Sequence, residues 1–387
     1  MKHKWKTFDF TLVFTPLVLA AFGIVMIYSA SMVTAVINGL PPHYFMQRQS
    51  ITFLLGLCGF VFACFFQYRF YQKFIKIIVV GLILLLVAVL LFGQDIKGNQ
   101  AWLRIGGFQF QPAEFVKLGL VMYLASVYSK KQQYINDFKT GVLPPLVLTC
   151  LMLGLIVLQP DLGTAAIVFL IACSVIFSSG IKLKHLLLLI VSGLVVIGLA
   201  FGNMINEERL SRFTGAYQPF SDPQDSGYQL IQSYVAIGTG GWTGEGLGQG
   251  VQKLGYLTEP YNDFIMAVIA EELGYIGILI VIGLLATIVL RGLYISKICE
   301  DSFGSMLAIG ISSMVGIQTF INLGAISGVL PITGVPLPFV SYGGSSLLIM
   351  MFSMGVLNNI ARTVKAKQIY HNKTSLKTEK GHVSHSN

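Results

Sequence analysis

The sequence predicts an all-α, polytopic integral membrane protein with about ten transmembrane helices. Hydrophobic residues make up 54% of the 387 residues and charged residues only 11%, whereas soluble domains contain about 25% charged residues. The apolar residues gather in long runs, and about 17 to 25 of them in a helix cross a bilayer about 30 Å thick. Lys and Arg concentrate in alternate connecting segments, which is typical of membrane topology.

Ten apolar runs are expected to be the membrane helices. In chain order they span residues 8–31, 50–66, 74–92, 113–128, 141–158, 162–179, 185–201, 263–293, 303–323 and 341–361. The fifth and sixth runs meet at Gln159-Pro160-Asp161, where proline favours a break and therefore a hairpin of two helices. The alternative is one kinked helix, but about 36 residues are too many for a single crossing.

The positive charges predict the orientation. If the N-terminus is cytoplasmic, 19 of the 26 Lys and Arg residues lie on the cytoplasmic side, six lie outside, and Lys117 lies within a helix. This asymmetry places both termini in the cytoplasm. The expected organisation is a membrane domain at 1–364, with a large extracellular loop at about 202–262 between helices 7 and 8, and a disordered basic tail at 365–387.

Composition also excludes several function classes. The net charge of +9 is explained by the basic loops that set the topology and that attract anionic lipids. Nucleic-acid binding is not needed to explain it. The five cysteines have no CxxC spacing and the six histidines are dispersed, so neither a disulfide framework nor a thiolate or histidine metal site is expected. The basic N-terminus resembles a secretory signal, but the long apolar run without a nearby cleavage site predicts an uncleaved first helix.

Two outer segments place charges beside membrane helices. The segment 97–117 carries an interfacial Trp102 and leads into the fourth helix, where Glu114 and Lys117 lie on one face at i and i+3. They are either functional or an internal salt bridge that lets both charges enter the bilayer. Asp161 follows the proline turn and is either a helix cap or a catalytic group.

Two further outer segments are rich in glycine and proline. The loop 202–262 has glycines whose amides could cradle a phosphate, but it matches neither GxxxxGK[ST] nor GxGxxG, so nucleotide binding is poorly supported. Residues 328–346 predict irregular backbone near the bilayer, which is tolerated only where protein or a wet cavity covers it.

Asp263 is the strongest candidate for chemistry. It is expected to open the eighth helix at its outer end, with Glu271 and Glu272 further along the same helix. Ionisable groups in membrane helices cost about 3 kcal/mol or more, so they are functional candidates by default. Asp263 and Glu271 would be about 12 Å apart along a helix, too far for the carboxylate pairs of glycosidases, at about 5 to 9.5 Å. Both glutamates are therefore expected to be structural, with neighbouring helices covering them.

These segments together resemble the shape, elongation, division and sporulation (SEDS) family of membrane proteins, the FtsW/RodA/SpoVE group, over about residues 8–365. The family's Thr-Asp-Phe-Ile segment corresponds to Asn262-Asp263-Phe264-Ile265, in which the Thr is replaced. The motifs Gly246-Leu247-Gly248 and Gln252-Lys253-Leu254 are more similar to the division members than to the elongation members.

The resemblance implies a peptidoglycan glycosyltransferase that polymerises lipid II into β-1,4 glycan strands at the outer face of the cytoplasmic membrane, with Asp263 as the catalytic residue. A diphosphate leaving group calls for cations rather than a general acid, so a single carboxylate can serve as the base. Arg104, Lys117 and Arg212 are expected to hold the diphosphate, with Lys253 as a weaker candidate. The other residues expected to line the cavity are Gln111, Glu114, Gln232, Ser341 and Tyr342.

No protein metal site is expected, although a divalent cation, Mg²⁺ or Mn²⁺, could share the diphosphate. The partners implied are a class B penicillin-binding transpeptidase and other division membrane proteins at the septum. Two other classes stay open. A lipid II flippase would use the same cavity without chemistry, although no inverted repeat typical of transporters is visible. A pure scaffold, the second class, would need no ionisable residues in its membrane helices. Within the enzyme class, an elongation or sporulation paralogue would share the same chemistry.

Overall fold

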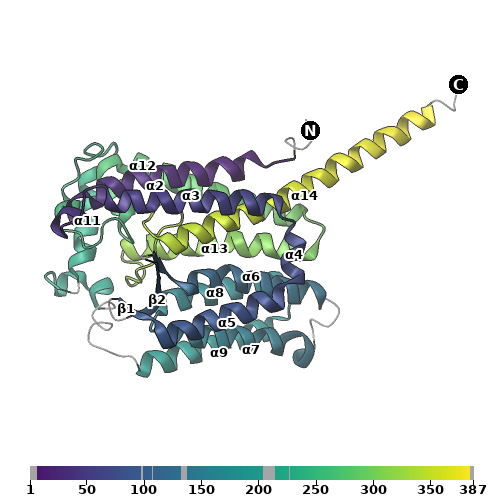
Figure 1. Ribbon diagram of the computed structural model, residues 1–387, viewed down its shortest axis with the longest axis horizontal. Helices are drawn as coiled ribbons and strands as arrows, with labels where there is room; N and C mark the ends of the chain where they lie inside the picture. The colour runs from purple at the N-terminus through teal and green to yellow at the C-terminus, as the bar shows by residue number, and fades with distance from the viewer. Residues whose placement is uncertain are drawn as a thin grey trace.

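The structure is a computed structural model that describes residues 7–96, 99–106, 108–131, 137–203, 214–225 and 227–383. Helices dominate it and run roughly parallel to one another (Figure 1). They are α2 (Phe10–Ile37), α3 (Tyr44–Phe65), α4 (Tyr68–Lys73), α5 (Ile75–Phe92), α6 (Pro112–Lys130), α7 (Leu143–Val157), α8 (Leu162–Ser178), α9 (Leu183–Asn203), α11 (Tyr228–Gly240), α12 (Ile265–Ile298), α13 (Ser302–Ile326) and α14 (Gly344–Val383).

Each of the ten predicted apolar runs coincides with a helix, which confirms the all-α membrane fold. Among the described residues, seven helices are long and apolar enough to cross a membrane, and α8 is a shorter apolar helix. The two remaining runs correspond to α6, which carries Glu114 and Lys117, and to α9. The break at Gln159-Pro160-Asp161 separates α7 from α8, so the hairpin prediction is confirmed and the single kinked helix is wrong.

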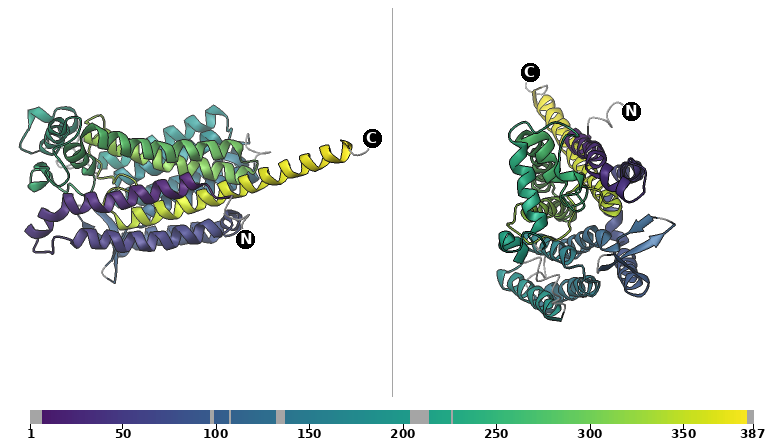
Figure 2. Two further views of the ribbon diagram at one scale, coloured as in Figure 1. Left: turned by 90° about the horizontal axis from the view of Figure 1, so that it is seen from above. Right: turned by 90° about the vertical axis from the view of Figure 1, so that its left-hand side faces the viewer.

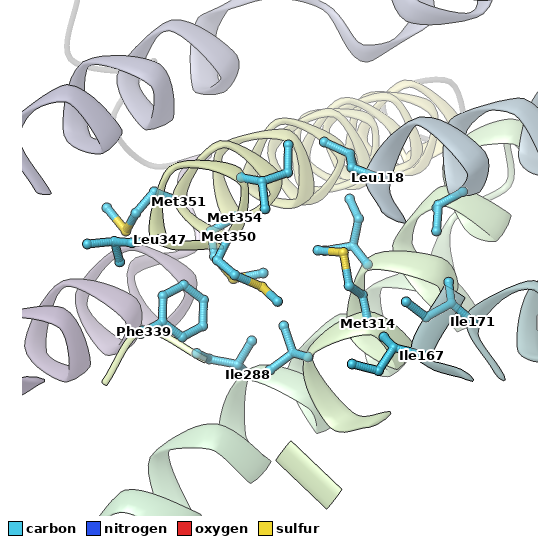
Figure 3. Packing of buried hydrophobic residues seen from close by; sticks show 14 of the residues in the cluster. Leu118, Ile167, Ile171, Ile288, Met314, Phe339, Leu347, Met350, Met351 and Met354 are labelled. Carbon is cyan, nitrogen blue, oxygen red and sulfur yellow. The ribbon is translucent and has the colours of Figure 1, made fainter. Parts of the chain in front are cut away.

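Helices α13 and α14 form the centre of the bundle. Helix α14 packs against α2, α3, α6 and α13, while α13 also packs against α8 and α12. Apolar side chains from these helices fill the space between them, including Met314 of α13 and Met350, Met351 and Met354 of α14 (Figure 3). Close packing of this kind fixes the helices relative to one another. Helices α5, α7 and α9 lie at one edge of the bundle (Figure 1).

The two ends of the bundle differ. Both termini lie at one end, where α14 projects beyond the other helices, and α11 with the loop segments lies at the opposite end (Figure 2). The segment after α5 folds into a small antiparallel sheet of β1 (Gln94–Ile96), β2 (Asn99–Ile105) and β3 (Phe108–Phe110). This sheet is an addition to the expected all-helical architecture, and it turns the chain back toward α6.

Helix α12 is broken near its N-terminal end. Its 34 residues would extend about 50 Å as a straight helix, but Gly274 has φ 64° and ψ −162°, outside the helical range. Backbone groups of the loop 240–246 bond to α12 on both sides of the break. Tyr275 N donates to Gly241 O at 3.0 Å, and Glu245 N donates to Glu271 O at 2.9 Å. The loop therefore satisfies groups that an unbroken helix would have satisfied internally.

Three expectations about element boundaries need correction. Helix α12 begins at Ile265, so Asp263 lies in the turn before it rather than at its first position. The outer loop 202–262 is not merely a loop, because it contains α11, which packs against α12. Helix α14 continues to Val383, through the tail for which the composition predicts disorder. That segment has no proline to stop a helix already nucleated within the bundle.

Candidate functional site

A cavity of about 1020 Å³ opens among α3, α6, α8, the sheet and the outer loops. Its floor is built by two irregular segments, the turn before α12 and residues 331–343 before α14. Tyr342 N donates to Tyr261 O at 2.9 Å, which joins these two segments directly. Residues 328–346 were expected to form irregular backbone that protein covers, and Leu337, Phe339 and Val340 are indeed buried.

Asp263 lines this cavity. Its main-chain oxygen accepts a hydrogen bond from Asn322 Nδ2 of α13 at 2.8 Å, and the same amide group donates to Val335 O at 2.8 Å. Asn322 therefore ties the turn that carries Asp263 to the proline-rich segment. The residue before Asp263, Asn262, donates through Nδ2 to Glu259 Oε2 at 2.9 Å. Asn262 stands where the resembling family has Thr, and its side chain makes this hydrogen bond to Glu259.

The first turn of α6 faces the cavity from the other side. Gln111 precedes the helix, donates through Nε2 to Asp161 Oδ2 at 2.8 Å, and lines the cavity together with Asp161. Thr164 N donates to Asp161 Oδ1 at 3.1 Å, so the expected cap of α8 is confirmed. Burial raises the pKa of the Asp161 carboxyl, and the negative charge of Glu114 adds to the rise, while the bonds from Thr164 and Gln111 oppose it.

Glu114 and Lys117 form the expected pair, with Lys117 Nζ 2.7 Å from Glu114 Oε1. Lys117 is 1% exposed, and its Nζ also donates to Gln318 Oε1 of α13 at 2.7 Å. Glu114 lines the cavity, but Lys117 is not among the lining residues. The ammonium group thus lies behind the cavity wall, where it neutralises Glu114.

The remaining predicted cations are placed differently. Arg104 is exposed on β2, pairs in register with Gln109 of β3, and lies two positions from Trp102. Side chains two apart on a strand point to the same side, and because both Trp102 and Gln109 line the cavity, Arg104 belongs to its rim. Arg212 falls outside the described residues.

Lys253 is not among the residues that line the cavity. It is 2% exposed, and its Nζ lies 2.5 Å from Glu272 Oε1 and 2.8 Å from Ser29 Oγ of α2. Glu272 also accepts from Gly248 N at 3.0 Å, while Glu271 Oε1 accepts from Val251 N at 2.7 Å. Both glutamates are thus structural, as expected, but their partners come mainly from the loop rather than from neighbouring helices.

Three further residues, Ser341, Gln232 and Tyr342, are also predicted to line the cavity. Ser341 is buried, and its Oγ accepts from Leu337 N at 2.8 Å, which shapes the segment before α14. Gln232 is half-buried on α11 and is not among the lining residues, whereas Gln229, one turn earlier, is. Tyr342 lines the cavity as expected.

Arg48 is the residue that sequence reasoning missed. It lies on the outer end of α3, lines the cavity, and has its guanidinium carbon 4.9 Å from the centre of the Tyr44 ring. Tyr342 also lines the cavity, so this cation and the Tyr342 ring border the same space. In the sequence, Arg48 is a single arginine next to an apolar run. Such a residue is also typical of an interfacial anchor, so the sequence alone does not identify it as a binding residue.

Comparison with known proteins gives consistent relationships. A family model described as cell cycle protein, covering FtsW, RodA and SpoVE, matches residues 10–366. The probable peptidoglycan glycosyltransferase FtsW of Bacillus subtilis (strain 168) is 48% identical over 375 residues, covering 94% of this chain and 93% of that protein. Stage V sporulation protein E of the same strain is 38% identical over 357 residues, covering 92% of this chain and 97% of that protein.

Two solved structures have the same fold. One chain belongs to a peptidoglycan synthase complex described for its structural coordination of polymerization and crosslinking; it is 30% identical, with a TM-score of 0.75 and coverage of 92% of this chain and 98% of that chain. The rod shape determining protein RodA of Thermus thermophilus is 28% identical, with a TM-score of 0.68 and coverage of 92% and 97%.

Proposed function

Since the chain belongs to the FtsW, RodA and SpoVE family of cell cycle proteins, we propose that it is a peptidoglycan glycosyltransferase that polymerises lipid II into β-1,4 glycan strands at the outer face of the membrane. The observation that carries the proposal is the position of Asp263 in the wall of a cavity of about 1020 Å³, in a chain 48% identical to a relative with that activity in its name. The same cavity is large enough to hold sugar units and a diphosphate together.

The reaction needs one base. The donor sugar is α-linked to a diphosphate and the product is β-linked, so a single displacement with inversion suffices. The acceptor 4-hydroxyl oxygen forms a bond to C1 of the donor, the bond from C1 to the diphosphate oxygen breaks, and the hydroxyl proton passes to Asp263. Glu271 cannot act as a second acid here, because its carboxylate is occupied by loop amides.

Arg48 takes the leading part in holding the diphosphate. Among the residues that the structure describes, Arg48 is the one Lys or Arg residue that lines the cavity. Arg104 lies at the rim of the cavity. Lys117 contributes indirectly by neutralising Glu114. We assign neither Lys253 nor Ser341 to the diphosphate, because their polar groups bond to Glu272 and to Leu337.

Replacement of Arg48 by Gln is expected to reduce glycan synthesis. Loss of a desolvated contact with developing negative charge costs about 2 to 4 kcal/mol, or about 30- to 900-fold in rate. Rates from purified protein and lipid II would measure the effect. Arg104→Gln serves as the comparison and should have a smaller effect because the rim is wetter. Full activity of Arg48→Gln would remove this residue from the diphosphate site.

A polymerisation assay with purified protein and lipid II tests the proposed function directly. Glycan strands that lysozyme digests are the expected product. A flippase would instead move lipid II across vesicle membranes and leave it unpolymerised. The assay should be run with and without a class B penicillin-binding transpeptidase, the partner proposed from the likeness to a peptidoglycan synthase complex. We infer a role in septal wall synthesis, beside other division proteins, and the similarity to FtsW supports it.

The proposed orientation has both termini in the cytoplasm, which is supported by the positive-charge bias and by the position of both termini at one end of the bundle. Cysteines introduced at Asp222, in the outer loop, and at Lys373, on α14, are therefore expected to react with an impermeant reagent from opposite sides of the membrane. The unsubstituted chain, with its five native cysteines, gives the background. Labelling of both positions from the same side would contradict the orientation.

A further inference from the structure

The small sheet forms one wall of the cavity. Among the residues that the structure describes, its Asn99, Ala101, Trp102 and Gln109 border the space. All four are uncharged, whereas the carboxylates and the guanidinium in the lining belong to other segments. A wall without charge attracts a diphosphate only weakly, so its ligand is expected to be an uncharged part of the substrate or product.

The neighbouring helices hold this sheet in place. Ala101 is 1% exposed, and β2 packs against α5 and α6. The centre of the Phe110 ring lies 4.7 Å from the centre of the Phe115 ring of α6. Gln111 N, directly after β3, donates to Ser345 Oγ of α14 at 3.0 Å. The sheet is therefore fixed relative to α6 and α14, as the wall of a binding site needs to be.

One face of the sheet surrounds Trp102 with polar side chains. Residues two apart on a strand point to the same face, so Gln100, Trp102 and Arg104 of β2 lie on this face. In register, Gln94 of β1 is the partner of Trp102. Gln109 of β3 is the partner of Arg104. The three glutamines are exposed and Trp102 is partly exposed. We call these five residues the amide–indole face.

An indole ring surrounded by amides is suited to sugars. A pyranose ring has an apolar C–H face, which stacks on an aromatic ring. Its hydroxyl and N-acetyl groups lie around the edge of the ring, where they donate and accept hydrogen bonds as primary amides do. Aromatic area combined with a few convergent polar groups is typical of the walls of small-ligand sites. The uncharged lining and the amide–indole face therefore both indicate a saccharide.

We propose that the amide–indole face is a saccharide subsite that holds N-acetylated pyranose rings of the growing glycan strand. This inference rests on the proposed function, because the strand is the product of that reaction. Arg104 places the face at the rim of the cavity, and a lengthening strand has to leave past the rim. Stacking on Trp102 slows the release of the strand, so further additions occur before it dissociates. The subsite therefore determines strand length more than the rate of a single transfer.

Trp102 also has a simpler interpretation as an interfacial anchor, because Trp is enriched where membrane helices meet water. An anchor contacts lipid head groups, whereas Trp102 borders the cavity together with Gln109. Trp242 provides a matched comparison. It is 74% exposed, its ring centre lies 5.6 Å from that of Tyr275, and it is not among the residues that line the cavity.

Binding of chitotetraose, a lipid-free β-1,4 oligomer of N-acetylglucosamine, to the purified full-length protein tests the subsite without catalysis. With Trp5 and Trp242 replaced by Phe, Trp102 is the one tryptophan left, and its emission should shift saturably during the titration. In calorimetry on the otherwise unsubstituted chain, Trp102→Ala should weaken binding about tenfold or more. Trp102→Phe should retain part of the affinity and Trp242→Ala all of it. With lipid II as substrate, Trp102→Ala should make shorter strands, and Trp242→Ala should not.

The outcomes separate this inference from the proposed function. No change in Trp102 emission, or equal affinity of the parent and Trp102→Ala proteins, overturns the subsite even if glycan is made. Strands of normal length from a folded Trp102→Ala protein overturn it as well. Emission that brominated lipids quench and that chitotetraose leaves unchanged identifies an interfacial anchor instead. Trp102-dependent binding with no glycan product leaves the subsite standing and rejects the proposed function. Melting curves identify misfolding, and if Trp102→Ala misfolds, Gln109→Ala decides, with unchanged affinity overturning the subsite.

Discussion

Asp263→Asn is expected to abolish glycan synthesis from lipid II while leaving lipid II binding and thermal stability close to those of the parent protein. The substitution keeps the size of the side chain and removes the base. Asp263 precedes α12, whose N-terminal end favours a negative charge, and the main chain is held by Asn322 whichever side chain is present. The loss should therefore appear in the rate and not in the fold.

Glu245→Gln is the matched control for this prediction, because it makes the same chemical change on an exposed segment outside the cavity lining. It should polymerise lipid II normally. Strand lengths and rates from the purified proteins give the measurement. Normal synthesis by Asp263→Asn would favour the flippase interpretation over the enzymatic one.

Lys253→Met is expected to cause the largest loss of stability. It leaves Glu272, which is 0% exposed, as a buried negative charge without its cation. Breaking a buried ion pair from one side costs about 3 to 5 kcal/mol. The folded fraction after heating in detergent should fall at a clearly lower temperature. Adding Glu272→Gln should restore part of the stability, because an amide oxygen at the position of Oε2 still accepts from Ser29 and Gly248.

Lys367→Met provides the comparison. Its partner is Glu300 at 3.2 Å, with the two side chains 48% and 70% exposed, and exposed pairs contribute about 0 to 1 kcal/mol. Equal melting temperatures for Lys253→Met and Lys367→Met would show that the buried pair contributes no more than a surface pair.

The membrane fold was largely predictable because apolar runs and charge bias are properties of the chain alone. The break at Gly274 was not, because it depends on hydrogen bonds from the loop 240–246, about thirty residues earlier in the chain. The small sheet was missed for a similar reason, since three short strands satisfy one another across turns and carry little sequence signal.

The site was predictable in part. Asp263, Gln111, Glu114 and Tyr342 line the cavity as the sequence analysis expected. Lys253 carries the same charge as Arg48, yet it is neutralised by Glu272 from a distant turn of α12, and no local pattern distinguishes the two. Gln318 and Asn322 could have been identified as polar residues within an apolar helix.

The break near the N-terminal end of α12 has a consequence for how this chain can vary. A Cβ atom at Gly240 would lie 1.8 Å from Ala270 O, and one at Gly244 would lie 2.2 Å from Glu272 O. Neither glycine lines the cavity, yet neither accepts even alanine without moving the backbone of α12 that follows Asp263. A genetic screen for inactive alleles is expected to find substitutions at both glycines. Such a result would reflect the close backbone packing at these positions rather than phosphate binding.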